Sequence, residues 1–491
     1  MRTPRGALLP PISAERVKRG HLYRSIRAAI LQGTLGASQQ LPSTRQAAED
    51  YGVSRGLMEE VYDQLVEEGF LDRVVGRGTF ISLHVGSLIA QTAIKNKEQL
   101  LPRPSRRGLS LAANAACREP LTSKPFNGGI ADTTEFPWKV WCRLQARATR
   151  ELGRAALSFS DPRGVPELRA SIASYVAQFR GMRCDPDQVI IFNSSQQALN
   201  ALSILLLDRG DTVWLEDPCY LGARAAFDLA GAEIKPVPVD DDGLRVELGI
   251  RRSANARLAY VTPSNQYPMG VALSLERRIA LLDWAKRKDS WVVEDDYDGE
   301  FRYEGQPLTP LYALDSQARV LYLGTLNKVM FVSLRLAYLI VPEQLVEPLA
   351  NIRTQLDGFT SPVTQRTMSL FIDEGYFASH LRRMRSIYGL KRTLLIRELS
   401  PLSELGWTWS NNPAGMHLSV RHRNSKYVRE VAASSSLDLA LLSFYRVSRS
   451  SEDGLFLRFG SLANDSLKEG AKALVAQARI YPQITQITQI L

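Results

Sequence analysis

The spacing of apolar residues changes along the chain, and each change indicates a new kind of structure. Over residues 22–31 the apolar residues recur on one side of a helix, which predicts an amphipathic helix. Ser43 and Ser54 each precede a further helical pattern and are good N-caps, so two more helices are expected there. Two short apolar runs then flank Gly76-Arg77-Gly78 and predict a β-hairpin. Residues 12–82 are therefore expected to form one domain of three helices and a hairpin.

A second pattern begins near Lys124, where apolar β-rich runs alternate with helical segments. This alternation is typical of βαβ units and favours an α/β fold with a mixed, mostly parallel sheet. Residues 123–491 are expected to form this domain, with a large subdomain over about 160–370 and a small C-terminal one. Residues 83–122 lack a sustained period and are interpreted as a mobile, basic linker. The expected strands are 189–192, 212–216, 258–262, 291–294, 320–324 and 337–341.

Composition narrows the class of protein. A chain of 491 residues with 45% hydrophobic residues is long enough for at least two domains. Its four cysteines are scattered without a C-x-x-C pair, so neither a metal site nor a disulfide framework is expected. The sequence has no apolar run of membrane-spanning length and no signal-peptide pattern, so we expect a soluble cytoplasmic protein.

Positive charge is unevenly distributed. The net charge is +10, and residues 1–125 hold 18 Lys and Arg against 11 Asp and Glu. The remaining residues hold 43 against 40, so most of the excess lies in the first quarter of the chain. Such an excess is typical of a module that neutralises DNA phosphates. It predicts that the N-terminal domain binds double-stranded DNA.

The residues expected to contact DNA lie at the helix starts, on the third helix and on the hairpin. Helix N-termini present N–H groups to phosphates, a helix face can enter the major groove, and the tip arginine suits a minor groove or a phosphate. The alternative is a helical bundle that binds a protein. The candidates are Ser43, Arg45, Ser54, Arg55, Met58, Tyr62, Arg73, Arg77 and Thr79.

The C-terminal domain contains the residue types that bind pyridoxal 5'-phosphate (PLP), an aldehyde with a pyridine ring and a phosphate. Lys328 could form a Schiff base with the aldehyde, and Asp295 could pair with a protonated pyridine nitrogen. Tyr297 could donate to the phenolic oxygen, and Tyr220 could stack on the ring. Each residue alone has an ordinary structural explanation, but their ordered combination favours a cofactor site. The phosphate candidates, at a helix start or near the lysine, are Ser195, Gln196, Thr325 and Arg335.

Several motifs resemble known families. LPSTR, YGVSR and GRGTF resemble the GntR-type winged helix-turn-helix, whereas FNSSQQAL, VEDDYDGEF and GTLNKVMFVSLRLAYLI resemble a fold-type I aminotransferase domain. By this combination the chain is identified as a member of the MocR subfamily of regulators. In this resemblance, Arg458 matches the arginine that clamps a substrate carboxylate. Tyr267 stands where aminotransferases have asparagine, and Asn265 is the candidate to supply the missing amide.

The resemblance implies a transcriptional regulator of amino-acid, amine or vitamin B6 metabolism that holds PLP as an internal aldimine. It also implies a head-to-tail homodimer that binds a DNA operator and responds to an amine, an amino acid or a vitamer. Two alternatives remain open at this point. The chain could be a working aminotransferase with an appended DNA-binding domain, or the aminotransferase-like domain could serve only for dimerisation.

Overall fold

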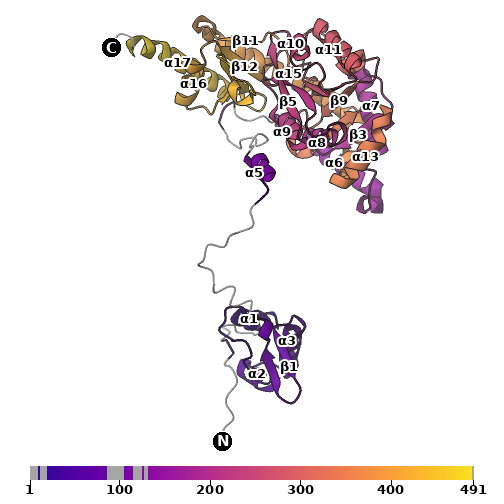
Figure 1. Cartoon of the computed structure of the whole chain (residues 1–491), viewed down its shortest axis with the longest axis vertical. Coiled ribbons are helices and arrows are strands. Elements are labelled where there is room, and N and C mark those ends of the chain that lie inside the picture. The colour runs from indigo at the N-terminus through magenta and orange to yellow at the C-terminus, as the bar shows by residue number, and fades with distance from the viewer. Residues whose placement is uncertain (1–8, 11–18, 86–103, 114–123, 127–130, 489–491) are drawn as a thin grey trace. The chain divides into compact units, whose positions relative to one another are not determined.

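Three helices and a hairpin form the N-terminal unit of the computed structural model, which describes residues 9–10, 19–85, 104–113, 124–126 and 131–488. The chain divides into two units, Met1–Pro104 and Ser105–Leu491 (Figure 1). The strands β1 and β2 pair antiparallel, with Leu71 opposite Ile81. The elements of this unit are α1 (Arg19–Leu31), α2 (Thr44–Tyr51), α3 (Arg55–Glu67), β1 (Leu71–Val74) and β2 (Gly78–Ile81).

Local signals explain where the helices of the N-terminal unit begin and end. The hydroxyl of Ser43 accepts a hydrogen bond from the N–H of Gln46, and that of Ser54 accepts one from Leu57. Both serines are therefore N-caps, which confirms the predicted helix starts. Helix α2 ends at Gly52, whose φ of 63° is easily adopted by glycine.

The expected linker is not uniformly irregular. Within 83–122, helix α5 (Arg106–Ala113) is regular, and it belongs to the C-terminal unit. The side chain of Arg107 donates a hydrogen bond to the carbonyl of Leu229 in helix α9 (Leu221–Ala230). The segment is therefore not irregular throughout, and the interpretation of residues 83–122 as a linker stays a prediction. Much of the remaining segment lies outside the described residues.

The C-terminal unit is built on an eight-stranded sheet with the order β3-β10-β9-β8-β7-β4-β5-β6. The consecutive strands β9-β8-β7-β4-β5 of this order run parallel to one another. Strand β10 runs antiparallel to both of its neighbours, β3 and β9. The mixed, mostly parallel α/β fold is confirmed. The strands are β3 (Val189–Phe192), β4 (Thr212–Asp217), β5 (Glu233–Asp240), β6 (Gly243–Leu244), β7 (Leu258–Val261), β8 (Trp291–Asp296), β9 (Val320–Thr325) and β10 (Ala337–Ile340).

Apolar side chains on both sides of this sheet are covered by helices. In β3, Val189 and Ile191 join a core with α6, α7 and α14, whereas Ile190 and Phe192 join a core with α8, α9 and α13. This burial on both faces explains the continuous apolar runs of the sequence. The covering helices are α6 (Trp138–Leu152), α7 (Pro166–Arg180), α8 (Ser195–Leu206), α9, α10 (Val246–Ser253), α11 (Leu275–Lys288), α13 (Glu343–Leu356) and α14 (Pro362–Asp373).

A second sheet of four strands, with the order β11-β12-β14-β13, follows the long helix α15 (Tyr376–Leu399). Helices α16 and α17 lie beside this sheet (Figure 1). Among the described residues, no helix combines the length and apolar character needed to cross a membrane. The elements are β11 (Thr408–Trp409), β12 (His417–His422), α16 (Ser425–Ser434), β13 (Ala440–Leu441), β14 (Asp453–Arg458) and α17 (Asn464–Thr488). Shorter elements of the unit are η1 (Gly153–Leu157), η2 (Pro186–Gln188), α12 (Leu311–Leu314), η3 (Val332–Leu334), η4 (Ser400–Leu405) and η5 (Leu442–Tyr445).

Candidate cofactor site and DNA-binding surface

The carboxyl ends of the parallel strands bring the candidate cofactor residues to one edge of the large sheet. Asp295 lies in β8, Thr325 is the last residue of β9, and Tyr220 follows β4. Ser195 begins α8 just after β3. In open α/β sheets this edge is where ligands bind.

Asp295 has one carboxylate oxygen engaged and one without a partner. The hydroxyl of Tyr260 in β7 donates to Oδ2 of Asp295 at 2.6 Å, whereas Oδ1 has no hydrogen-bond partner among the described residues. Burial raises the pKa of Asp295 to about 7, although the Tyr260 hydrogen bond and the charge of Lys328 act in the opposite direction. A buried acceptor without a donor is costly. A pyridinium N–H would satisfy it, so Asp295 fits the cofactor chemically.

The acids on either side of Asp295 have structural partners. Glu294 accepts hydrogen bonds of 2.9 Å from the backbone N–H groups of Leu311 and Tyr312, at the start of α12. Asp296 forms a buried ion pair with Arg180 and accepts a 2.7 Å hydrogen bond from Tyr322. These contacts fix the end of β8 and therefore the position of Asp295.

Lys328 lies in a loop that is tied to the next strand. The side-chain oxygen of Asn327 accepts a 2.9 Å hydrogen bond from the N–H of Leu336, and the N–H of Asn327 donates to Thr325 Oγ1 at 3.3 Å. Lys328 is half-buried, and Arg335 is exposed with a φ of 57°. Asn327 thus holds the lysine segment against the start of β10.

Asn265 and Tyr297 contact each other directly. The hydroxyl of Tyr297 donates to the carbonyl of Asn265 at 2.8 Å and lies 3.2 Å from Asn265 Nδ2. Nδ2 also donates to Asp298 Oδ2 at 2.9 Å. Burial raises the pKa of Asp298 to about 8. Asn265 therefore links the turn after β7 to the turn after β8.

Gln196 connects the start of α8 to the residues that follow Tyr220. The side-chain amide of Gln196 donates to the carbonyl of Gly222 at 2.9 Å. A Cβ atom at residue 222 would overlap both the Tyr220 ring and the Gln196 amide, so glycine is needed there. The start of α8 is thereby joined to the start of α9.

Arg458 is held by two tyrosines. Its Nη2 lies 3.2 Å from the hydroxyl oxygen of Tyr267 and 3.2 Å from that of Tyr445. The Tyr267 ring packs edge-on against Tyr220 and Tyr297, each with 5.7 Å between ring centroids. Tyr267 therefore joins Arg458 to the aromatic residues of the candidate cofactor site.

A loop of the C-terminal part is attached to the residues preceding Tyr220. The carboxylate of Asp217 accepts hydrogen bonds from the N–H groups of Val447 at 2.9 Å and Ser448 at 3.1 Å. The N–H of Cys219 donates to the carbonyl of Tyr445 at 2.9 Å. Tyr445, which contacts Arg458, is therefore held directly against the loop that carries Tyr220.

Three residues of this region have no distinguishing signal in the sequence. Tyr260, Asp298 and Tyr445 are each in positions that would equally suit core or loop residues. They reach the site only because the strands and loops that carry them pair over long sequence distances.

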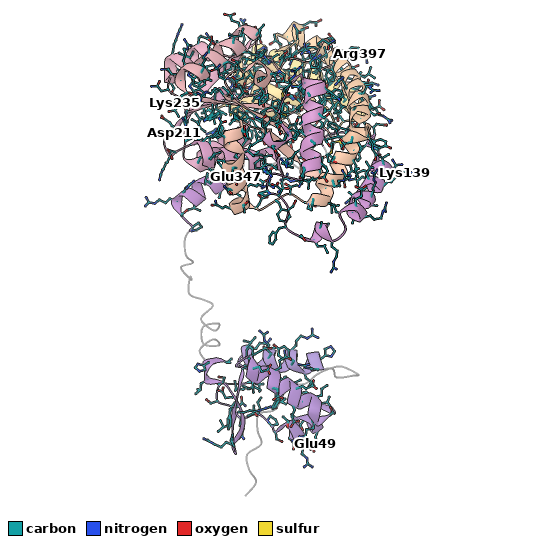
Figure 2. The ribbon with its side chains drawn as sticks, turned by 90° about the vertical axis from the view of Figure 1, so that its right-hand side faces the viewer. Glu49, Lys139, Asp211, Lys235, Glu347 and Arg397 are labelled. Carbon is teal, nitrogen blue, oxygen red and sulfur yellow. The ribbon has the colours of Figure 1, made fainter. Side chains whose placement is uncertain are left out.

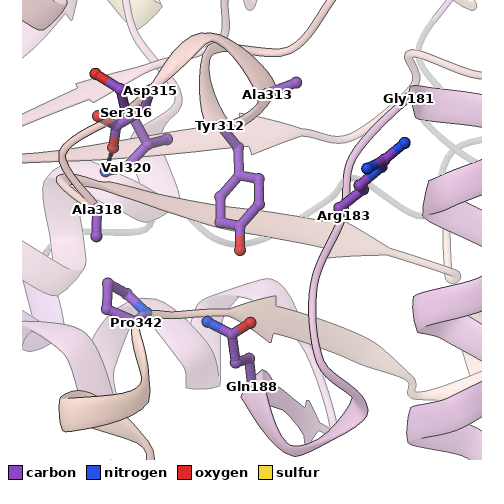
Figure 3. Close-up of a pocket in the computed structure, with 10 residues that line it drawn as sticks. All are labelled: Gly181, Arg183, Gln188, Tyr312, Ala313, Asp315, Ser316, Ala318, Val320 and Pro342. Atoms are coloured by element: carbon purple, nitrogen blue, oxygen red, sulfur yellow. Dashed lines mark hydrogen bonds between the residues drawn. The ribbon is translucent and has the colours of Figure 1, made fainter.

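A separate pocket of about 410 Å³ lies at the opposite edge of the sheet. It is lined by Gln188, which precedes β3, and by Val320, the first residue of β9. Figure 3 shows the ring of Tyr312 extending into this pocket towards Gln188. Because Thr325 is at the other end of β9, this pocket is distinct from the candidate cofactor site.

In the N-terminal unit, three candidate DNA-binding residues surround one hollow of about 390 Å³. Ser43, Arg73 and Thr79 line it, together with the acidic Glu59 and Asp63. A phosphate entering this hollow would therefore meet both a cation and nearby carboxylates.

Three of the candidate arginines form exposed ion pairs. Arg45 lies 3.5 Å from Glu49, and Arg55 lies 3.1 Å from Glu59, each one helical turn apart. Arg73 pairs with Asp63 at 2.5 Å. Figure 2 shows Glu49 at the rim of this unit. Arg77 is exposed at the hairpin tip, where its carbonyl accepts a 2.7 Å hydrogen bond from Gln40.

The prediction that Met58 and Tyr62 contact DNA is wrong. Both side chains are fully buried in the core of the N-terminal unit. The buried stripe of α3 is Met58, Val61, Tyr62 and Leu65, which follows the 3.6-residue helical period. Leu57, Val61 and Leu65 recur every four residues and suggest a different buried face, on which Met58 and Tyr62 would be exposed. Leu57 is only partly buried, so the 3.6-residue stripe is the buried one.

The basic excess of residues 1–125 does not lie in the folded N-terminal unit, contrary to the expectation from the sequence. Residues 19–85 contain seven arginines, no lysine and eight Asp or Glu. The described N-terminal unit is therefore not basic. The excess belongs to residues 1–18, with four basic and one acidic residue, and to residues 86–125, with seven and two.

Comparison with known proteins covers both units. Residues 18–81 match the family model for bacterial regulatory proteins of the gntR family, and residues 131–452 match that for class I and II aminotransferases. The probable rhizopine catabolism regulatory protein MocR of Rhizobium meliloti is 35% identical over 92% of each chain. The pyridoxine biosynthesis regulator PdxR of Corynebacterium glutamicum is 31% identical over 91% of this chain and 93% of its own.

A solved structure resembles the C-terminal unit. The α-aminoadipate aminotransferase LysN of Thermus thermophilus, in complex with N-(5'-phosphopyridoxyl)-L-leucine, matches with a TM-score of 0.66 and 26% identity. The match covers 77% of this chain and 96% of LysN. The aminotransferase fold of this part is therefore common to the chain and to an enzyme whose bound ligand contains a phosphopyridoxyl group.

Proposed function

The chain belongs to the MocR subfamily of GntR-type transcriptional regulators, and we propose that it senses an amino compound or a vitamer through PLP held at Lys328. The aminotransferase class I and II fold implies PLP binding, and the gntR-type domain implies DNA binding. The observation that supports the proposal most is Oδ1 of Asp295, which is buried and has no hydrogen-bond partner among the described residues. Lys328 follows β9, the strand that pairs with β8 and so runs beside Asp295.

The proposed roles follow from the chemistry of each side chain. When bound, PLP supplies an aldehyde carbon that reacts reversibly with amines. The amine of Lys328 would hold that carbon, and Asp295 would accept a hydrogen bond from the pyridinium nitrogen. Arg458 would bind an effector carboxylate with its guanidinium fork. The remaining proposed contacts are Tyr220, Asn265 and Tyr297 for the ring and Ser195, Gln196, Thr325 and Arg335 for the phosphate side.

Selection of duplex DNA from a random pool, with and without PLP, tests the regulator directly. Enrichment of a defined sequence supports the proposal, and its absence under both conditions contradicts it. Steady turnover of an amino acid with a 2-oxo acid would favour the alternative, an aminotransferase with an appended DNA-binding domain. Cofactor binding alone does not discriminate, because both functions need it.

Arg45→Ala and Arg77→Ala are each expected to weaken DNA binding at all sequences. Each removes one proposed phosphate contact, so the slope of log affinity against log salt should fall by about 1. Arg24→Ala is the matched control, because Arg24 is exposed on α1 and donates to the carbonyl of Gly20 in its own helix. Fluorescence anisotropy at several salt concentrations measures the effect. A change in sequence preference with an unchanged slope would contradict a phosphate contact.

We also propose a head-to-tail homodimer. The side chains of Leu157 and Phe159 are 87% and 96% exposed in the C-terminal unit, and Phe159 lies 6.1 Å from Phe359 between ring centroids. Neighbouring exposed apolar side chains of this kind are typical of surfaces that a partner covers.

Leu157→Glu is therefore expected to shift the protein from dimer to monomer, because it buries a charge in the proposed interface. Size-exclusion chromatography with light scattering measures the mass. Leu390→Glu on α15 is the control, since Leu390 is also well exposed, at 72%. An unchanged dimer in Leu157→Glu would place the interface elsewhere.

A further inference from the structure

A histidine stands directly beside the proposed carboxylate-binding arginine. Strands β12 and β14 pair antiparallel with His417 opposite Arg458. Residues that oppose each other in this way project from the same face of a sheet, with Cβ atoms about 5 Å apart. The His417 side chain is buried, and its ring lies 4.7 Å from that of Phe456 and 6.3 Å from that of Tyr297. His417 thus lies between the cofactor residues and Arg458.

The hydrogen bond made by the His417 ring determines which of its two nitrogens carries the proton. The ring bonds to the carbonyl of Pro268, which can only accept, and Nε2 has no partner among the described residues. Nδ1 therefore carries the proton, and Nε2 presents a lone pair. Burial, then the charges of Arg458 and Lys328, lower the pKa of His417 to about 3, so the ring is neutral near pH 7.

Gly270 is the neighbour of this nitrogen. A Cβ atom at residue 270 would lie 3.9 Å from Nε2, in van der Waals contact, so the absence of a side chain there leaves this side of Nε2 uncovered. The nearby cations Lys328 and Arg458 are assigned to the amine and the carboxylate of an effector in the proposed function. Nε2 is thus a buried acceptor in the same site, and a donor from a ligand would relieve the cost of leaving it unpaired.

We propose that Nε2 of His417 accepts a hydrogen bond from a hydroxyl or N–H group on the effector side chain. This inference rests on the proposed function, in which the C-terminal unit binds an amino compound at Lys328 and Arg458. The site then selects amino acids that carry such a donor over amino acids of the same shape that lack it.

Two pairs of amino acids of matched shape test the selection: threonine with valine, and homoserine with norvaline. Each is titrated into the PLP-loaded, full-length protein, and the change in visible absorption gives the dissociation constant. In the wild type, the hydroxylated member of at least one pair should bind about tenfold more tightly, as one hydrogen bond allows. In His417→Phe, which keeps an aromatic ring without an acceptor, the ratio should fall to about one. His417→Gln, whose amide oxygen restores an acceptor, should recover part of it.

The outcomes separate this inference from the function on which it rests. If PLP binds but no amino compound perturbs the absorption, amine sensing fails and this inference fails with it. If amino acids bind without preference within a pair, or the preference persists in His417→Phe, only the role of His417 is overturned. Should His417→Phe not retain PLP, His417→Met replaces it as a variant of similar size without a strong acceptor.

Discussion

Lys328→Ala is expected to abolish the visible absorption band that added PLP gives the wild-type protein, and with it any effect of amino compounds on DNA binding. The substitution removes the amine that would hold the aldehyde carbon, so only non-covalent contacts remain. Retention of PLP should weaken on the order of 100-fold or more, equivalent to at least about 2.7 kcal/mol. Absorption spectra after dialysis measure the first effect, and DNA-binding titrations of the PLP-treated protein with and without amino compounds measure the second.

The matched control for this experiment is Lys286→Ala, because Lys286 is exposed in the last turn of α11. It should behave as the wild type. An unchanged band in Lys328→Ala would exclude Lys328 as the amine that holds PLP. A lost band with an unchanged ligand response would instead support the alternative in which the aminotransferase-like domain serves only for dimerisation.

Asp295→Asn is expected to weaken PLP binding about 10- to 100-fold, because the charge-assisted hydrogen bond to the pyridinium becomes a neutral one. The exchange keeps the shape of the side chain and its contact with Tyr260. Equilibrium titration with PLP measures the affinity. Asp283→Asn on the exposed side of α11 is the control. An affinity equal to that of the wild type would exclude Asp295 from pairing with the ring nitrogen.

Asp295→Asn is expected to stabilise the folded protein when PLP is absent. Burial raises the pKa of Asp295 from 3.8 to about 7, so the folded state favours the protonated acid. The Asp295 carboxyl group contributes most to the free energy of unfolding below its pKa in the unfolded chain. This contribution is lost as the pH rises towards 7, its pKa in the folded protein. The amide that replaces the carboxyl group does not titrate. Without PLP, Asp295→Asn should therefore gain in melting temperature over the wild type between about pH 5 and pH 8, whereas with PLP the wild type should gain more.

Local signals in the sequence were sufficient to predict the main elements. The expected strand 320–324 corresponds to β9 (Val320–Thr325), and both serine caps begin helices as predicted. These features depend on residues that are neighbours in the chain: a continuous apolar run, or a hydroxyl within reach of an N–H group two or three residues later. The family was recognisable for the same reason, since its motifs are contiguous.

The buried face of α3 and the geometry of the candidate site depend on contacts between residues that are far apart in the sequence. The sequence of α3 is compatible with two apolar faces, Leu57-Val61-Leu65 and Met58-Val61-Tyr62-Leu65, and only the packed structure shows that Met58 is buried. Tyr445 contacts Arg458 and Tyr267 only after β14 and the turn beyond β7 have been brought together. The basic excess of residues 1–125 does not by itself show whether the folded domain or its flanks carry the charge.

The ion pairs of the N-terminal unit have a consequence for how long this protein stays on arbitrary DNA. Arg45, Arg55 and Arg73 each have an acidic neighbour, and an exposed pair of this type costs no more than about 1 kcal/mol to open. If these arginines bind phosphates as proposed, the released carboxylates would face the phosphates and repel them. Contact with a random duplex should then be brief, and the protein should stay longer only where base-specific contacts add to the phosphate contacts.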